Sequence, residues 1–361
     1  MPKHNPSNER IKRKYLVFQK EACQQSESTI DSIAKSLSRF EEHSQYRDFN
    51  KFHFEQAVAF KRKLLAQKNE RTGEALSKST VKTTLNQLRR FIEWLSQQTG
   101  YRSRLNYCDA EYFNLSEKDA RIAAASRPKK IPTLEQIKAV IENMPAGSDI
   151  ELRNRALLSF VLLTGARDSA VASMSLKHVD IAEGSVFQDA REVNTKFSKT
   201  FTTYFFPVGD EVQKVLQDWV EHLRIKLMWG EDDPLFPSTK VEVGPAQQFA
   251  ANGLQRVHWR TTSPIRDIFK SAFVAAGLPY YNPHSFRDTL VGFAERRCRT
   301  PEEFKAWSQN LGHENVMTTF TSYGEVSETR VSEILSQVKP SNSLDGKQIS
   351  KERLLNFLKD C

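Results

Sequence analysis

The sequence has few cysteines and no long apolar run. Its four cysteines, Cys23, Cys108, Cys298 and Cys361, are far apart and form no Cys-x-x-Cys pair, so neither a zinc site nor a disulfide framework is indicated. The most apolar run, residues 156 to 163, is too short to span a bilayer, and the N-terminus has no apolar signal core. We therefore expect a protein of a reducing, cytoplasmic setting without a membrane segment.

The chain also has fewer acidic than basic residues. Its 361 residues contain 53 lysines and arginines against 44 aspartates and glutamates, a formal net charge of +9, and the isoelectric point is near 9.2. This excess favours a polyanionic partner, because neutralising phosphates releases counterions. The charge alone does not distinguish DNA from RNA or a membrane surface. The length favours two domains, and an apolar content of 39% supports globular folding.

Residues 28 to 120 are predicted to form a helical domain, preceded by a basic N-terminal extension over residues 1 to 27. Apolar residues recur at helical spacing from Ile30 to Phe40, within residues 53 to 67, and again from Val81 to Leu95. The polar face of the third helix carries three basic residues, Lys82, Arg89 and Arg90. This face is either an ordinary solvated helix surface or a contact with a nucleic-acid backbone.

A basic stretch with two prolines separates this domain from the next. Residues 121 to 132 include Lys129 and Lys130 and suit an exposed linker that follows phosphates. Directly after it, Thr133 and Gln136 have the spacing of a capping box, so we expect the second domain, residues 133 to 338, to begin with a helix. Residues 339 to 361 are predicted to form an amphipathic tail helix.

The second domain is predicted to be mainly helical with a small antiparallel sheet. Residues 153 to 164 are typical of a buried helix that ends at Gly165, and the β-rich stretch from Val186 to Val208 is typical of a hairpin. Helical spacing returns over residues 212 to 227, 265 to 276 and 286 to 296. The predicted fold class is therefore α+β, mainly α.

Four short motifs in the second domain carry side chains suited to phosphoryl transfer, and a tyrosine, Tyr323, follows them. The motifs are Thr164-Gly165-Ala166-Arg167, Thr195 to Lys199, His284-Ser285-Phe286-Arg287 and Leu311-Gly312-His313. Phosphodiester exchange needs a nucleophile in line with the leaving oxygen and cationic donors on the non-bridging oxygens. Arginine suits the second task, because its planar fork donates two parallel hydrogen bonds to a phosphate and stays charged.

Each of these residues alone also has a plainer interpretation. A single arginine is more often part of a surface ion pair, a single histidine a hydrogen-bonded structural residue, and a single tyrosine part of a core. A metal site joining His284 and His313 would need a carboxylate at a ligand-like spacing, and the sequence offers none that demands it. No metal or cofactor is therefore expected.

The order Arg, Lys, His-x-x-Arg, His, Tyr resembles that of the tyrosine recombinase (phage integrase) family. The resemblance covers residues 28 to 338 and is strongest from Arg153 to Tyr323. It implies a helical core-binding domain and an integrase-type catalytic domain that together clamp duplex DNA. It further implies that the catalytic residues are Arg167, Lys199, His284, Arg287, His313 and the nucleophile Tyr323.

The resemblance also assigns roles to these residues. Tyr323 would form a covalent 3′-phosphotyrosine while the two arginines and two histidines contact the phosphate, and a lysine would protonate the leaving 5′ oxygen. Lys199 is favoured for that step because it stands eight residues before Pro207, a spacing similar to that in relatives; Lys196 is the alternative. Paired exchanges through a Holliday junction would then recombine two DNA sites without ATP or metal.

Double-stranded DNA is the partner that the resemblance implies, in a synapse of four protomers that an accessory DNA-bending protein can assist. The tail over residues 339 to 361 either docks on a neighbouring protomer or packs on its own domain. A phage or mobile element is the expected source. The candidate DNA contacts are Lys82, Arg89, Arg90, Lys129, Lys130 and Lys196.

Several positions depart from the family pattern. Ala170 stands where relatives usually carry an acidic residue that braces the site, and Asp168 is a candidate substitute; Asp288 stands where histidine is common. The interval from His313 to Tyr323 is one residue longer than the commonest spacing. These departures motivate one alternative, a catalytically degenerate DNA-binding protein. A type IB topoisomerase would share the chemistry, but the small N-terminal helical domain argues against it.

Overall fold

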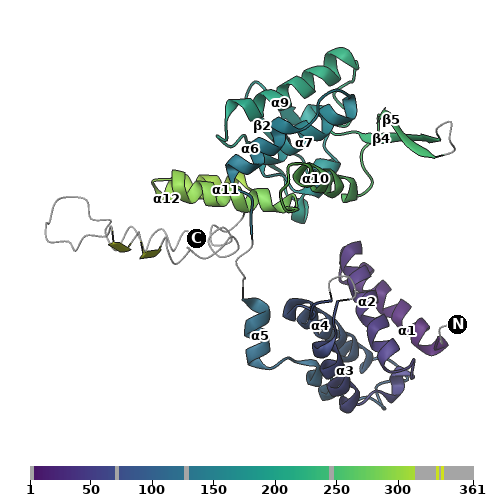
Figure 1. The fold of residues 1–361 in the computed structure, drawn as a ribbon. Helices are drawn as coiled ribbons and strands as arrows, with labels where there is room; N and C mark the ends of the chain where they lie inside the picture. The colour runs from purple at the N-terminus through teal and green to yellow at the C-terminus, as the bar shows by residue number, and fades with distance from the viewer. Residues whose placement is uncertain are drawn as a thin grey trace. The chain divides into compact units, whose positions relative to one another are not determined.

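The computed structural model of the chain consists of two compact units, Met1–Ser126 and Arg127–Cys361. It describes residues 4–69, 73–125, 130–243 and 248–313, together with 331–332 and 335–336. The division between the units lies inside the predicted linker over residues 121 to 132, although helix α5 (Glu117–Ala124) occupies the first part of that stretch. Both units are mostly helical (Figure 1).

Four longer helices build the first unit: α1 (Pro6–Val17), which continues into a π-helical turn at Phe18–Ala22, α2 (Glu27–His43), α3 (Phe54–Ala66) and α4 (Lys78–Leu95). The three helices expected from periodicity are therefore present. The apolar stripe of α4 from Val81 to Leu95 is buried, as predicted. It packs into an aromatic core in which the ring of Phe40 contacts Phe60 and Phe113 at centroid distances of 5.3 Å and 5.7 Å.

The prediction of a separate extension over residues 1 to 27 is wrong in one respect, because helix α1 is part of this unit. Ile11 and Tyr15, one helical turn apart, are buried in the same core as α2 and α4. Asn8, also buried, accepts a hydrogen bond from the Phe49 amide at 3.0 Å and donates to the carbonyl of Arg47 at 3.0 Å. Three of the basic residues of α1, Arg10, Arg13 and Lys14, are exposed, and this short apolar stripe is not evident among them in the sequence.

Helices also dominate the second unit, and the predicted capping box at Thr133 and Gln136 is present at its first helix. The remaining elements follow in chain order: α6 (Leu134–Asn143), α7 (Asp149–Thr164), α8 (Asp168–Ala172), a 3₁₀ turn at Leu176–His178, β1 (Val179–Asp180), β2 (Ser185–Gln188), a 3₁₀ turn at Lys196–Ser198, β3 (Phe201–Tyr204), α9 (Asp210–Glu221) with a π turn at His222–Lys226, β4 (Ser238–Val243), β5 (Phe249–Gln255), α10 (Ser263–Ala275), α11 (His284–Arg297) and α12 (Pro301–Asn310).

Helix α7 is the centre of the second unit. Every residue from Ala156 to Thr164 is buried, which matches the continuous apolar run that predicted a core helix. The three-stranded antiparallel sheet has the order β1-β2-β3, with Val186 opposite Thr203, so β3 is an edge strand. The hairpin predicted between Val186 and Val208 is thereby confirmed, and the fold class is mainly α with small antiparallel sheets.

A second, two-stranded sheet formed by β4 and β5 extends away from the helices of this unit (Figure 1). Its base is fixed by the buried Arg153 of α7, whose guanidinium donates to the carbonyl of Pro237 at 2.8 Å and to the hydroxyl of Thr239 at 3.0 Å. The same guanidinium stacks over Trp259 at 5.1 Å from the ring centroid. The hairpin is thus anchored where it leaves the core.

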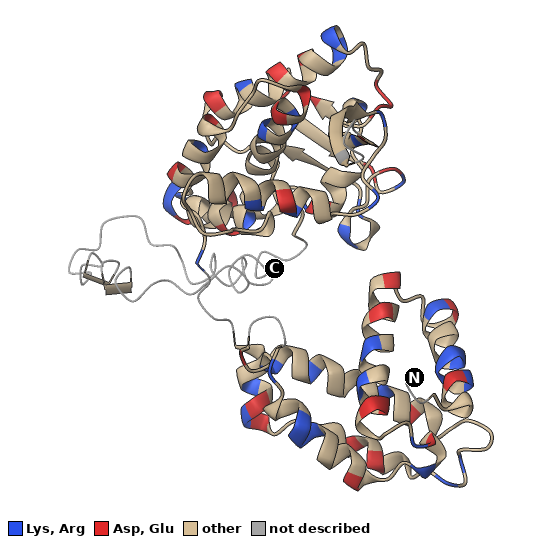
Figure 2. Cartoon of the chain, turned by 45° about the vertical axis from the view of Figure 1, so that its right-hand side comes forward, with Lys and Arg blue, Asp and Glu red and all other residues tan. Residues whose placement is uncertain are grey.

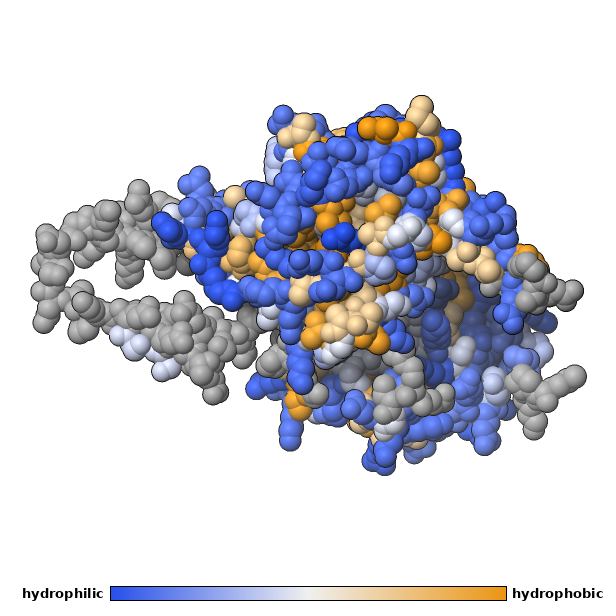
Figure 3. All heavy atoms as spheres, turned by 45° about the horizontal axis from the view of Figure 1, so that its top comes forward, coloured by the Kyte–Doolittle hydropathy of each residue, from blue (hydrophilic) through white to orange (hydrophobic). Residues whose placement is uncertain are grey.

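Basic and acidic residues are interspersed on the helices of both units (Figure 2). On the face shown in Figure 3, hydrophilic residues predominate and the apolar ones form scattered patches. Over the part of the chain that the structure describes, no helix has both the length and the apolar character that a membrane crossing would require.

Candidate active site

The turn after helix α7 brings Arg167 to the site. Gly165 ends the helix in the left-handed conformation, with φ of +60°, and a Cβ there would lie 2.7 Å from Cδ2 of Leu311. The hydroxyl of Thr164 donates to the carbonyl of Phe160 at 2.7 Å and accepts from the Ala166 amide at 3.1 Å, which fixes the turn. The Thr-Gly-Ala-Arg motif is therefore a helix end that positions Arg167 at the start of α8.

A small pocket of about 10 Å³ lies beside this turn, roughly enough for one water-sized group. Two arginines and one lysine line it, and none of its lining residues, all within the described part of the chain, is acidic. The cations come from the end of α7, the β2–β3 loop and α11. The lining consists of Thr164, Gly165, Ala166, Arg167, Ala170, Gln188, Thr195, Lys196, Phe201, Thr203, Arg287 and Leu311.

Arg287 is the most buried cation of the pocket, with an exposed fraction of 2%. Its Nη1 donates to the carbonyl of Gly165, and its Nη2 donates to the carbonyl of Leu311 at 2.7 Å and to Nε2 of His313 at 2.9 Å. Its Nε is buried and has no hydrogen-bond partner among the described residues. A buried donor without a partner is costly, so this atom suits an acceptor supplied by a ligand.

His313 is held neutral by these surroundings. Because Nε2 accepts from Arg287, the ring proton belongs on Nδ1. Burial and, in decreasing order, the positive charges of Arg287, Arg167, His284 and Lys196 together lower the pKa of His313 to about 3. Four residues that the sequence analysis singled out therefore lie near this ring, although they are far apart in the sequence.

His284 is the first residue of α11 and is exposed, whereas the next seven residues of that helix are buried. The helix therefore presents His284 at its solvent end and holds Arg287 inside. The structure brings Arg167, Lys196, Arg287 and His313 together, with His284 close enough to act on His313 electrostatically. Tyr323 lies outside the described residues.

A family model described as "Phage integrase family" matches residues 132–330, more than half of the chain. The chain belongs to the phage integrase family. The tyrosine recombinase family predicted from the motifs is therefore confirmed, and with it the enzyme class, a DNA strand-transferase.

Curated relatives of this phage integrase family member include tyrosine recombinases. The chain is 24% identical over 255 residues to tyrosine recombinase XerC of Lactobacillus delbrueckii subsp. bulgaricus, an alignment that covers 69% of this chain and 72% of the relative. It is 27% identical over 214 residues to XerC of Halalkalibacterium halodurans, over 57% of this chain and 62% of that one.

Solved structures share the fold. XerH site-specific recombinase bound to a palindromic difH substrate has a TM-score of 0.59 at 17% identity, over 92% of this chain and 85% of that one. The Tn1549 transposon integrase in complex with transposon right end DNA has a TM-score of 0.57 at 13% identity, over 92% of this chain and 99% of that one.

Of the two candidate lysines in this integrase fold, the structure places Lys196 in the lining of the pocket. Lys199, which the sequence spacing favoured, follows the 3₁₀ turn, and its backbone carbonyl accepts a hydrogen bond from the hydroxyl of Thr195 at 2.7 Å. Left-handed backbone at Phe197 and Ser198, with φ of +60° and +50°, reverses the chain between the two lysines. Counting residues back from Pro207 does not capture that reversal.

The tip of the same loop carries Phe197, whose side chain is 77% exposed. The ammonium of Lys196 lies 4.8 Å from the centroid of this ring, within the range of a cation–π contact. A phenylalanine with positive φ is strained, because its Cβ crowds the backbone. The loop therefore presents Lys196 and an apolar ring together.

Ala170 is buried in the pocket lining, at the position where an acidic brace was expected from relatives. Asp168 faces another helix: it accepts two hydrogen bonds from Arg266 of α10, at 3.0 Å and 2.7 Å, and one from the Ser169 amide at 3.0 Å. Asp168 thus joins the start of α8 to α10 and does not replace a carboxylate in the pocket lining. Asp288 is buried directly after Arg287.

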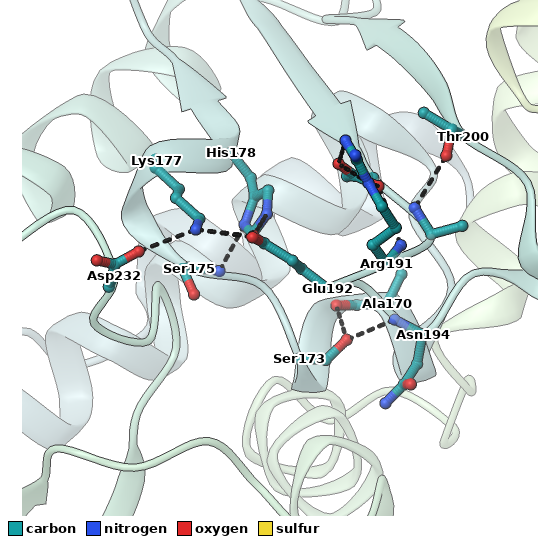
Figure 4. Close-up of polar contacts among 12 residues, drawn as sticks. Ala170, Ser173, Ser175, Lys177, His178, Arg191, Glu192, Asn194, Thr200 and Asp232 are labelled. Atoms are coloured by element: carbon teal, nitrogen blue, oxygen red, sulfur yellow. Dashed lines mark hydrogen bonds and ion pairs between the residues drawn. The ribbon is translucent and has the colours of Figure 1, made fainter.

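Sequence reasoning missed the polar contacts that fix the lysine-bearing loop (Figure 4). The Asn194 amide donates to the hydroxyl of Ser173 at 2.8 Å, and that hydroxyl donates to the carbonyl of Ala170 at 3.2 Å. Nearby, Glu192 pairs with Lys177 at 2.8 Å and with His178 at 3.1 Å. These contacts join the loop to α8 and to the 3₁₀ turn at Leu176–His178. Single serines and glutamates carry no sequence signal for such a role.

The remaining predicted DNA contacts stay predictions. Arg90 is exposed on α4, Lys82 is partly exposed, and Arg89 lies 3.6 Å from Glu93 of the same helix. Lys130 is exposed. Lys129 and the predicted tail helix over residues 339 to 361 lie outside the described residues.

Proposed function

We propose that this protein is a site-specific DNA recombinase that cleaves and rejoins DNA strands through a covalent 3′-phosphotyrosine at Tyr323. The observation that carries the proposal is the convergence of Arg167, Arg287 and Lys196 on one pocket without an acidic lining residue, beside a neutral His313. A scissile phosphate places negative charge against these three cations. The small pocket suits one non-bridging oxygen of such a phosphate.

The arginines serve to stabilise charge that builds on the phosphate during transfer. Arg287 is already oriented by three hydrogen bonds, so binding a phosphate requires little reorganisation of its guanidinium. Its buried Nε gains an acceptor when the phosphate arrives. Arg167, which also lines the pocket, provides a second planar donor group.

His313 is suited to donate a hydrogen bond to the phosphate. With Nε2 accepting from Arg287, the ring proton resides on Nδ1, so Nδ1 is the donor atom of this ring. An approaching phosphate raises the pKa of this ring, because a negative charge favours the imidazolium. His313 and His284 can therefore assist proton transfer as well as binding.

The bond changes balance without an external energy source. The phenolic oxygen of Tyr323 gives its proton to a histidine of the site and attacks phosphorus, the bond to the 5′ oxygen breaks, and a lysine gives that oxygen a proton. The 5′ hydroxyl of a second strand then attacks the phosphotyrosine and releases the tyrosine. Since one phosphodiester replaces another, the exchange needs no ATP, and two rounds through a Holliday junction complete recombination.

We assign the proton donation to Lys196 on geometry, with Lys199 as the alternative. A substrate in which sulfur replaces the bridging 5′ oxygen separates them, since a thiol of pKa about 8.5 leaves without protonation. The variant that lacks the true donor, Lys196→Ala or Lys199→Ala, loses cleavage of the oxygen substrate by about 100-fold or more and retains cleavage of the sulfur substrate. If Lys199→Ala shows this selective loss and Lys196→Ala does not, Lys199 is the proton donor.

Double-stranded DNA is the proposed partner. The solved XerH structure contains a difH substrate and the solved Tn1549 integrase structure contains transposon DNA, both in the same fold. We further propose four protomers in the synapse, an accessory DNA-bending protein and a phage or mobile-element origin. Docking of the tail predicts that truncation after Pro340 preserves cleavage and impairs assembly.

The experiment that tests the proposed function uses a duplex selected for tight binding from a randomised library, with nicks placed at successive positions as suicide substrates. Wild-type protein is expected to form a denaturation-resistant adduct at one nick position, and Tyr323→Phe none. Stable DNA binding with no adduct at any nick position would contradict the catalytic proposal and favour a DNA-binding protein without strand-cleavage activity. An adduct that survives the substitution would assign another nucleophile.

A further inference from the structure

Asn310, the last residue of helix α12, joins that helix to the edge of the three-stranded sheet. Its side-chain Oδ1 accepts from the Tyr204 amide at 2.7 Å, and its Nδ2 donates to the Tyr204 carbonyl at 2.8 Å. The amide of one side chain thus satisfies both main-chain groups of a residue on edge strand β3, as a neighbouring strand would. Because one group is a donor and the other an acceptor, the orientation of the Asn310 amide is determined by its partners.

A second chain of hydrogen bonds runs alongside. Gln188 of β2 donates to the hydroxyl of Thr203 at 3.0 Å, and Thr203 donates to the main-chain carbonyl of Asn310 at 3.2 Å. Both Gln188 and Thr203 line the cationic pocket. The end of α12 is therefore connected through β3 and β2 to the floor of the site.

The two sides of this junction carry different parts of the catalytic machinery. Strand β3 begins directly after the loop that holds Lys196. The residues after Asn310 supply the Leu311 carbonyl, which accepts from Arg287, and the His313 ring. Between them Gly312, with φ of +73°, approaches the Phe201 ring so closely that a Cβ would lie 2.8 Å from it.

We propose that Asn310 is a positioning residue that holds the lysine-bearing hairpin in register with Arg287 and His313. Proton delivery to the leaving 5′ oxygen and charge stabilisation on the non-bridging oxygens then act on the same phosphate. This inference rests on the proposed function. It adds that the side-chain amide of Asn310 is one of the links that couple the lysine-bearing hairpin to the histidine turn.

The test compares single-turnover cleavage of two suicide substrates that differ at one atom, oxygen or sulfur at the bridging 5′ position mapped from the wild-type adduct. Loss of lysine positioning slows only the substrate whose leaving group needs a proton. Asn310→Ala is expected to slow cleavage of the oxygen substrate by about 10- to 100-fold, since small displacements of a catalytic group have effects of that size. Cleavage of the sulfur substrate is expected to stay within about threefold of wild type.

A matched control is available in Asn143→Ala. Asn143 also ends a ten-residue helix, α6, but its side chain donates only to the carbonyl of Ala139 in its own helix, at 2.7 Å. This variant is expected to cleave both substrates at the wild-type rate. Asn310→Asp provides a second test if Asn310→Ala does not fold: its carboxylate still accepts from the Tyr204 amide and no longer donates to the carbonyl, so the same selective loss is expected.

Three results would overturn the inference. Equal slowing of both substrates by a folded Asn310 variant would show a general structural role, and wild-type rates on both would show no role. If wild-type protein forms no adduct with either substrate, the proposed function fails, and the inference with it. If wild-type protein cleaves both substrates and the Asn310 variant shows no selective loss, the inference about Asn310 fails and the proposed function stands.

Discussion

The close packing of Gly165 against its neighbours leads to a quantitative prediction. Gly165 has φ of +60°, and an added Cβ would lie 2.7 Å from Leu311 and 3.2 Å from Leu290. Gly165→Ala therefore combines two costs: about 1–2 kcal/mol for left-handed backbone and about 1–3 kcal/mol for overpacking. The sum, about 2–5 kcal/mol, should lower the unfolding temperature of the second unit by about 5–15 °C.

A control substitution separates the two costs. Gly277, just after α10, also has positive φ, +69°, but has no heavy atom within 4 Å of an added Cβ. Gly277→Ala should therefore carry only the backbone cost, about 1–2 kcal/mol. Differential scanning calorimetry of wild type and both variants measures the two shifts on the same unit.

The outcome that would contradict this reasoning is an equal shift for the two variants. It would mean that Leu311 and Leu290 move away at little cost, and that the turn before Arg167 is looser than its geometry indicates. A larger shift for Gly165→Ala, with weaker strand cleavage, would show that the packing of this turn also maintains the position of Arg167 and of the carbonyl that Arg287 binds.

Three further predictions concern other parts of the second unit. The pKa of His313 is lowered from 6.5 to about 3, so between these pH values the unfolded chain binds more protons than the folded one. The free energy of unfolding should therefore fall by up to about 1.4 kcal/mol per pH unit as the pH drops below 6.5. Urea titrations at several pH values should show this contribution in wild type and not in His313→Gln. Phe197→Gly should stabilise the protein by about 0.5–1 kcal/mol in the same assay, because it relieves positive φ at a side chain that is 77% exposed; destabilisation would reveal a packing role. Arg153→Met should speed amide exchange in β4 and β5 by about tenfold, matching about 1.4 kcal/mol of lost local stability from the donors to Pro237 and Thr239; unchanged exchange would place the anchor elsewhere.

The sequence predicted much of the architecture because its apolar spacing is regular. The stripes of α2 and α4, the continuous apolar run of α7 and the capping box at Thr133 each depend on contacts within one helix or on one buried face. Helix α1 was missed because few apolar residues carry its packing among many basic ones: Ile11 and Tyr15 are buried, and Leu16 is partly buried. Local periodicity is weak when a helix buries so little of its surface.

The structure brings some of the predicted site residues together, and their catalytic roles stay predictions. The motifs around Arg167, Arg287 and His313 are short and local, so their order survives in the sequence. The choice between Lys196 and Lys199 depends on two left-handed residues, Phe197 and Ser198, neither of which is a glycine that would have marked the turn. Contacts such as Asn310 with Tyr204 join residues more than one hundred positions apart, and no local pattern encodes them.

The placement of Arg287 has a consequence for the charge of the whole site. The two carbonyls that it contacts belong to the C-terminal ends of helices, Gly165 at the end of α7 and Leu311 at the end of α12. Each helix end carries a partial negative charge from its aligned peptide dipoles. Peptide dipoles have no protons to gain or lose and are not displaced by an incoming anion. The buried guanidinium is thus held by neutral carbonyl groups, and among the described residues no ion pair of Arg287 has to break before a phosphate binds.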